Sequence, residues 1–162
     1  MTAAQAASHL LAGDFEWSVD WAWGLPLIVL TVLFHVWGLM LINQRALRAS
    51  SRTIQQRHPM ALFVVVMGCT TLLVSILHGT EACIWAVAYR MLGALPDTNS
   101  AVLYSLNAIT SYGHINEHLD ARWHLMGALE ALNGWLLFGL TTAFLFAMIQ
   151  KVLSVDNPLA HR

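Results

Sequence analysis

The stretch Asp97–Ile115, with the sequence DTNSAVLYSLNAITSYGHI, decides the fold of this chain. It lies between two long apolar runs, and the apolar residues of its first part recur at helical spacing. A helix of about ten residues covers only about 15 Å, half of the hydrocarbon core of a bilayer. At membrane depth, its backbone polar groups are stable only beside protein or water. We therefore expect a re-entrant segment that borders a water-filled path.

The composition predicts an integral membrane protein. Apolar residues make up 57% of the 162 residues and charged residues only 10%, whereas a soluble domain carries roughly a quarter charged residues. The lipid bilayer is thus an expected partner, and the net charge of −1, without a basic cluster, gives no indication of nucleic acid. Cys69 and Cys83 have no metal or disulfide spacing and are interpreted as small buried apolar residues.

Three membrane spans are expected, at residues 25–42, 60–89 and 125–150, within a single all-α membrane domain of residues 1–162. Residues 1–24 precede the first span, and residues 43–59 form a basic loop after it. Pro26 is predicted in the first turn of the first span, where a missing N–H has little effect. Pro59 is predicted to open the second span and Pro96 to close it.

Charge predicts the orientation of this multi-pass chain in the cell membrane. The loop 43–59 contains Arg45, Arg48, Arg52 and Arg57, half of the eight Lys and Arg residues, and no acidic residue. Because cytoplasmic loops are enriched in Lys and Arg, this loop is predicted to be cytoplasmic. The N-terminus is then external, and the C-terminus is cytoplasmic beside Lys151.

The re-entrant segment, residues 97–115, is expected to begin as a helix over 99–109, with Asp97, Thr98 or Ser100 as its N-cap. Its C-terminus would point into the membrane, where the negative end of the helix dipole favours a cation. Residues 110–114 are expected to return as extended chain. Several copies around an axis would direct their carbonyl oxygens at a dehydrated cation.

The order span, loop, short helix, Tyr-Gly, span resembles the pore domain of tetrameric potassium channels, in particular those of small bacterial ion-channel proteins. Tyr104-Ser105, Tyr112-Gly113 and the run Gly127-Ala-Leu-Glu-Ala-Leu-Asn-Gly134 carry the resemblance, which extends over residues 75–149. It implies a homotetrameric ion channel that conducts a monovalent cation, K⁺ in the family, and needs no other cofactor. It also implies a selectivity filter formed by Thr110, Ser111, Tyr112 and Gly113.

The chain departs from the family filter, Thr-Val-Gly-Tyr-Gly-Asp, at three positions. Ile109 replaces a threonine whose hydroxyl lines the innermost ion site, and His114 replaces an aspartate at the outer mouth. Ser111 replaces a glycine in a left-handed conformation, which costs another residue roughly 1–2 kcal/mol. A cation pore of relaxed selectivity and a non-conducting scaffold or accessory subunit therefore both stay open.

Ionisable residues inside the spans are expected to support the filter. His78 and Glu81 lie one helical turn apart, and Glu130 lies a turn or so into the third span. Intramembrane ionisable residues are functional candidates by default. The three are interpreted either as a hydrogen-bonded brace behind the filter or as a polar cluster that ties two helices together.

Gly134 lies where the family places its gating hinge, and it also belongs to a row of small residues that permits close helix packing. Asn133, Thr141 and Thr142 either face an inner water-filled cavity or bond to neighbouring helices.

Histidines raise two further hypotheses. His114, His118 and His124 flank the predicted outer mouth, and they are either a proton-sensitive group or loop residues without a role.

A haem protein would need axial histidines at one depth, yet His35 and His78 are expected to differ in depth by about 10 Å. A haem-binding redox role is thus disfavoured. No nucleophile elbow, metal motif or nucleotide loop indicates an enzyme.

Overall fold

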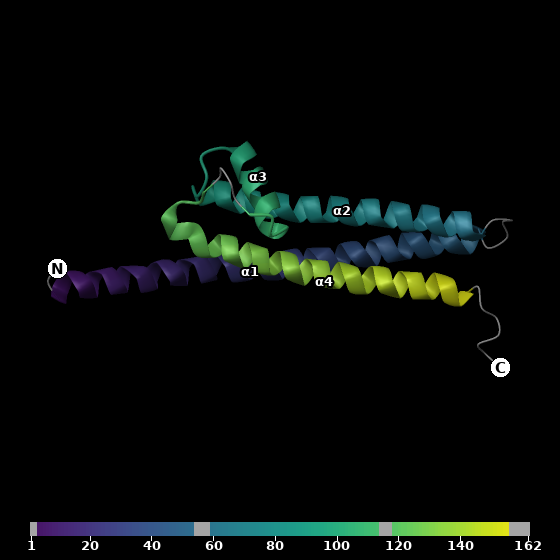
Figure 1. Ribbon diagram of the computed structural model, residues 1–162, viewed down its shortest axis with the longest axis horizontal. Helices are drawn as coiled ribbons and strands as arrows, with labels where there is room; N and C mark the ends of the chain where they lie inside the picture. The colour runs from purple at the N-terminus through teal and green to yellow at the C-terminus, as the bar shows by residue number, and fades with distance from the viewer. Residues whose placement is uncertain (1–2, 54–58, 114–117, 156–162) are drawn as a thin grey trace. The chain divides into compact units, whose positions relative to one another are not determined.

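The computed structural model describes residues 3–53, 59–113 and 118–155. Over these ranges the chain is helical, without strands, and the order of its elements is visible in Figure 1. The elements are α1 (Ala3–Thr53), α2 (Pro59–Met91), α3 (Thr98–Ile109), the 3₁₀ helix η1 (Ala121–Trp123) and α4 (His124–Val155). The all-α fold class is therefore confirmed, as is the short helix between two long ones.

Three helices are long and apolar enough to cross a membrane. Their candidate spans are Ser18–Ala46 in α1, Phe63–Met91 in α2 and His124–Lys151 in α4. These spans include the predicted spans 25–42 and 125–150 and overlap most of the predicted span 60–89, which supports a multi-pass membrane protein. The side of the membrane on which each terminus lies stays a prediction.

Helix α1 is longer at both ends than the first predicted span. Since it starts at Ala3, Pro26 lies inside the helix and not in its first turn. Membrane helices tolerate proline because neighbouring groups satisfy the freed carbonyl. Helix α1 also continues to Thr53, so much of the predicted basic loop is helical. Arg, Ala, Leu and Gln in this region all favour helix, and no glycine or proline interrupts it before Pro59.

The chain divides into two compact units. Unit 1 contains Met1–Val32 and Thr80–Leu136, and unit 2 contains Leu33–Gly79 and Leu137–Arg162. The core of unit 1 is built by one buried face each of α2, α3 and α4: Trp85, Ala86, Tyr89, Ala101, Tyr104, Ala108, Met126 and Leu129. In this core the rings of Tyr89 and Tyr104 meet edge to face, with 5.3 Å between their centroids.

Helix α3 begins at an N-cap that its sequence predicted. Asp97 is extended (φ −142°, ψ 166°), and its carboxylate accepts hydrogen bonds from the backbone N–H of Ser100 (2.9 Å) and the Ser100 hydroxyl (2.8 Å). These two hydrogen bonds lower the pKa of the Asp97 carboxyl below its ordinary value. A charged cap at the positive end of the helix dipole therefore fixes where α3 starts.

The C-terminus of α3 is closed by a Schellman cap centred on Ser111. Ser111 has a φ of 54°, which confirms the predicted left-handed conformation. The N–H of Ser111 donates to the carbonyl of Ala108, and the N–H of Tyr112 donates to the carbonyl of Asn107, each at 2.9 Å. Helix-end carbonyls thus obtain partners, at the cost of placing a non-glycine residue at positive φ.

Helix α2 ends in the same type of cap, with glycine at the left-handed position. Gly93 has a φ of 66°, its N–H donates to the carbonyl of Arg90 (3.2 Å), and the N–H of Ala94 donates to that of Tyr89 (2.9 Å). The helix therefore stops at Met91, before Pro96, because Gly93 reverses the chain first.

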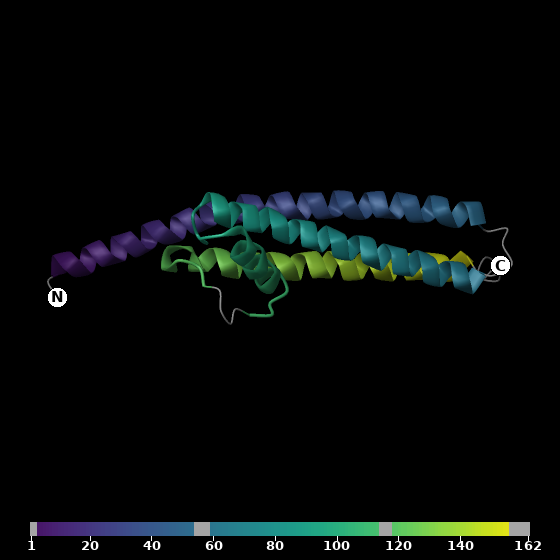
Figure 2. The same ribbon diagram turned by 90° about the horizontal axis from the view of Figure 1, so that it is seen from above.

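Helix α4 lies directly against the C-terminal end of α3 at Gly134. A Cβ built at Gly134 would overlap the carbonyl oxygen of Ile109, which is backbone and cannot rotate away. Gly134 is ten residues beyond His124, the first residue of α4, and so about 15 Å along the helix. The close crossing of α3 over the first half of α4 can be followed in Figure 2. Helix packing, one of the two predicted roles of Gly134, is thus observed.

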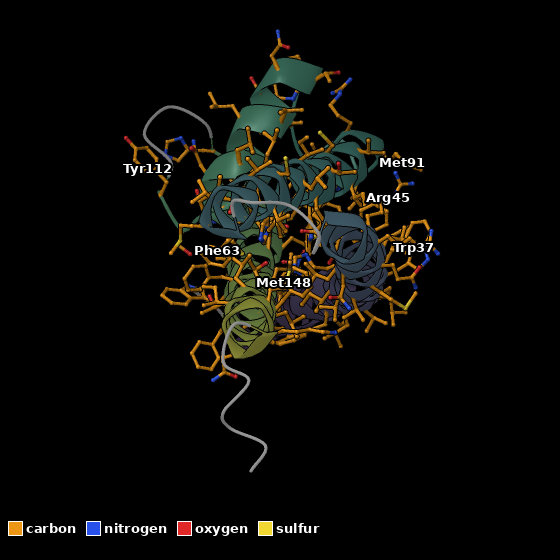
Figure 3. The ribbon with its side chains drawn as sticks, turned by 90° about the vertical axis from the view of Figure 1, so that its right-hand side faces the viewer. Trp37, Arg45, Phe63, Met91, Tyr112 and Met148 are labelled. Atoms are coloured by element: carbon orange, nitrogen blue, oxygen red, sulfur yellow. The ribbon has the colours of Figure 1, made fainter. Side chains whose placement is uncertain are left out.

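Unit 2 has a smaller core, formed by Leu39 and Ile42 of α1 with Val74 and Leu77 of α2. Its outer surface is apolar. Trp37, labelled in Figure 3, is 55% exposed, as expected for a lipid-facing side chain.

The two cysteines, Cys69 in unit 2 and Cys83 in unit 1, are both exposed. The prediction that they are buried is wrong, because in lipid an apolar residue gains nothing by facing the protein core.

We expect Gly134→Ala to lower the free energy of unfolding by about 1–3 kcal/mol, since the added methyl group must push α3 away from α4. Gly139→Ala is the matched control on the same helix, because a Cβ there meets nothing within 4 Å. It should instead stabilise the helix by up to about 1 kcal/mol. Denaturant titration in detergent micelles measures both, and equal effects would contradict the packing role.

A reciprocal swap tests the strain at Ser111. Ser111→Gly should raise the free energy of unfolding by about 0.5–1 kcal/mol, because the left-handed penalty exceeds the added entropy of the unfolded chain. Gly93→Ser, at the equivalent position of the α2 cap, should lower it by a similar amount. Thermal unfolding of both variants and of the wild type shows whether each substitution stabilises or destabilises the protein. A stabilising Gly93→Ser would refute the argument.

Candidate functional site

The predicted filter residues lie on the surface of unit 1, directly after α3. Thr110, Ser111, Tyr112 and Gly113 are all exposed in the single chain, and Tyr112 is 75% exposed. Figure 3 shows the Tyr112 side chain pointing away from the helices. His114 lies outside the described residues.

The conformation of this segment corrects one prediction. Thr110 does not start an extended return, because it is still helical (φ −87°, ψ −4°) and is followed by the left-handed Ser111. The physical reason is that the last carbonyls of α3 take the nearest backbone N–H groups as partners. Gly113 is also left-handed, with a φ of 97°. The segment therefore starts with a turn at Thr110 and Ser111, and Tyr112 and Gly113 follow it without regular secondary structure.

Ile109, the last residue of α3, packs into unit 1. Its side chain is buried, and its carbonyl oxygen faces the α-carbon of Gly134. Ile109 thus supplies neither a side-chain oxygen nor an exposed carbonyl, and the polar surface starts at Thr110.

Glu130 of α4 is the centre of a buried polar cluster in unit 1. One carboxyl oxygen accepts a hydrogen bond from the Tyr89 hydroxyl of α2 (2.7 Å), and the other accepts one from the Ser105 hydroxyl of α3. The Ser105 oxygen also lies 2.7 Å from the carbonyl oxygen of Ala82, so its single proton is shared between two acceptors. All three side chains are buried. The cluster therefore ties α3 to both long helices beside it.

Glu130, one residue of the predicted brace, has hydrogen-bond partners that were not predicted, and the brace of His78, Glu81 and Glu130 stays a prediction. Among the described residues, Glu130 bonds to Tyr89 and Ser105, whereas His78 belongs to unit 2 and bonds there. Glu81 is fully buried on α2 in unit 1. Sequence reasoning missed Tyr89 and used Ser105 only for the family resemblance. The available signal was that Ser105 shares the small-residue face of α3 with Ala101 and Ala108.

Asn133 bonds to a neighbouring helix within unit 1, one of its two predicted alternatives. Its amide donates to the hydroxyl of Thr31 on α1 (2.9 Å), and Thr31 in turn donates to the carbonyl of Leu27 (2.8 Å). The Asn133 carbonyl oxygen is buried without a hydrogen-bond partner in the described part of the chain. This contact joins α4 to α1 by polar groups inside candidate spans.

A second polar cluster lies in unit 2, where the imidazoles of His35 and His78 are 5.0 Å apart between ring centroids. The Nε2 atoms of both rings lie within hydrogen-bond distance of the Thr141 hydroxyl, at 3.1 and 3.0 Å. The predicted difference of about 10 Å in depth is therefore wrong. Counted from the α1–α2 connection, His35 is 18 residues before Thr53 and His78 is 19 residues after Pro59, so both lie about 27–28 Å along their helices.

The remaining polar residues have local contacts. His124 bonds through Nε2 to the carbonyl of Leu119 (3.0 Å), His118 is exposed, and Thr142 donates to the carbonyl of Phe138 (2.9 Å). A proton-sensitive outer mouth stays a prediction.

No family model, curated protein or solved structure matches this chain. The resemblance to the potassium-channel pore domain stays a prediction from the residues that carry it.

Glu130→Ala is expected to destabilise unit 1 by about 1–3 kcal/mol, because the buried Tyr89 hydroxyl loses its acceptor, whereas Ser105 keeps the carbonyl of Ala82 as an acceptor. Glu130→Gln keeps one acceptor oxygen and should therefore lower the free energy of unfolding by less than Glu130→Ala does. Leu132→Ala, on an exposed position of the same helix, is the matched control and should have a small effect. Chemical unfolding in micelles gives the three values, and an Ala variant as stable as the control would exclude the tie between helices.

Proposed function

We propose that the chain is a subunit of a homotetrameric membrane pore that conducts monovalent cations, potassium-like in its architecture and relaxed in selectivity. One observation carries the proposal: an exposed polar segment, residues 110–113, follows a short helix that meets α4 about 15 Å from the first residue of α4.

The first step concerns the backbone of this segment. If α4 crosses the bilayer over His124–Lys151, Gly134 and the α3 end beside it lie at membrane depth. Lipid offers no hydrogen bonds, so exposed N–H and C=O groups at that depth must face protein or water. Copies of the chain clustered around an axis would provide both, with residues 110–113 along the axis.

The second step concerns charge. The C-terminal end of α3 carries the negative end of the helix dipole, which favours a cation beside it. Thr110 and Ser111 add hydroxyl oxygens, which together with backbone carbonyls are the ligands that hard monovalent cations prefer. The Glu130 cluster supports the proposal because it holds α3 in one position against α2 and α4. A fixed α3 keeps its end aimed at the same point in every subunit.

The third step concerns selectivity. The family threonine at the inner ion site has no equivalent here, because Ile109 has no side-chain oxygen and is buried. Fewer oxygen ligands weaken the replacement of the ion's hydration shell. Discrimination between K⁺ and Na⁺ is therefore expected to be weaker than in the family.

Cysteine accessibility in liposomes tests the proposal. Cys69 and Cys83 are first replaced by Ala, and Thr110→Cys or Ser111→Cys is then introduced. Purified protein should carry a K⁺ flux down a gradient, and a charged, membrane-impermeant thiol reagent should block that flux in both variants. Leu132→Cys, on a lipid-facing position of α4, is the control and should be insensitive.

Chemical cross-linking of the same preparations gives the subunit number. A stable tetramer without flux at any pH or voltage would replace the proposal by the non-conducting scaffold. A monomeric protein would remove the pore altogether.

A further inference from the structure

The polar cluster of unit 2 is not explained by the proposed pore. It consists of His35 on α1, His78 on α2 and Thr141 on α4. His35 is fully buried, His78 is half-buried, and Thr141 is buried. The core of the same unit is aliphatic and aromatic, formed by residues such as Leu39, Leu77 and Phe34. Two imidazoles at one level of an apolar helix cluster are costly to bury, so they need a compensating interaction.

The Thr141 hydroxyl is a common hydrogen-bond partner of the two rings. Its oxygen lies 3.1 Å from the Nε2 atom of His35 and 3.0 Å from that of His78. It can donate its one proton to one ring and accept from the other, or accept from both rings through its two lone pairs. In either case both Nε2 atoms converge on one point, as they would on a bound cation.

The distances suit a common metal ligand set. The nearest ligand nitrogens of His35 and His78 lie within 4.8 Å of one another. Two imidazoles on one tetrahedral Zn²⁺ have nitrogens about 3.3 Å apart, because each Zn–N bond is about 2.0–2.1 Å. The tilt of 48° between the ring planes also keeps the rings from stacking. Small side-chain rotations would bring both nitrogens onto one ion, with the Thr141 oxygen on the same side.

We propose that His35 and His78 bind a single divalent first-row transition-metal ion, with Zn²⁺ as the ion that suits the site, and that Thr141 lies at its edge. Imidazole nitrogen is a preferred ligand of Zn²⁺, and this ion has no geometric preference from its d electrons. Haem fits less well, because the Thr141 hydroxyl bridges the two rings and leaves no plane between them for a porphyrin. The bound ion would fasten α1 to α2 in unit 2.

Co²⁺ is the spectroscopic probe, titrated into the purified metal-free chain in micelles with Cys69 and Cys83 replaced by Ala. We expect one Co²⁺ per chain, visible d–d absorption, and displacement of Co²⁺ by Zn²⁺. His35→Ala and His78→Ala should each weaken binding by more than about tenfold, since even outer-shell losses at metal sites cost that much. His118→Ala, which removes an exposed imidazole, is the matched control and should bind as the parent chain does.

Two measurements keep the test decisive if an alanine variant fails to fold. His78→Cys supplies another zinc ligand and should retain binding, with a stronger Co²⁺ absorption from the thiolate. In the parent chain, Zn²⁺ should raise the unfolding temperature, and a chelator should reverse the shift. Equal affinity in the parent, His35→Ala and His78→Ala, or a Soret band in the purified protein, would overturn the proposal. None of these readouts depends on ion flux, so the pore proposal can fail independently.

Discussion

The structure depends on one constraint: inside a bilayer, each backbone N–H and C=O group needs a partner within the protein or in water. Over the three candidate spans, the long helices satisfy this requirement through their own backbone hydrogen bonds. At the ends of α3, Asp97 satisfies it on one side and the Ser111 cap on the other. Residues 110–113 are exposed directly after α3, and this exposed backbone is the basis of the proposed pore.

The same constraint governs the polar side chains inside the spans. Glu130, Tyr89 and Ser105 satisfy one another in unit 1, and His35, His78 and Thr141 do so in unit 2. Each cluster takes one side chain from each of three helices. Groups of this kind fix which helix faces meet, because any other pairing would leave a buried donor or acceptor without a partner. The two clusters therefore serve as positional restraints, whatever else they bind.

Local signals in the sequence were sufficient for several features. Helical spacing and the Asp97 cap located α3 to within one residue, and Pro59 marked the start of α2. Comparison with the family filter indicated a left-handed Ser111, which the structure has. Helix ends without a strong stop were less predictable: α1 continues well past Ile42, and Gly93 ends α2 before Pro96 does. The end of α2 depends on a cap whose hydrogen bonds are visible only in three dimensions.

The amino-acid sequence by itself determined an all-helical membrane chain with three spans and a short helix too short to cross, because hydropathy and periodicity are properties of each segment alone. Only the tertiary structure decided the partners of the polar residues. His35 and His78 were expected at different depths, yet their imidazoles are in contact, because both histidines lie 18 or 19 residues from the α1–α2 connection. Depth depends on where helices end and which faces meet, and no single segment contains that information.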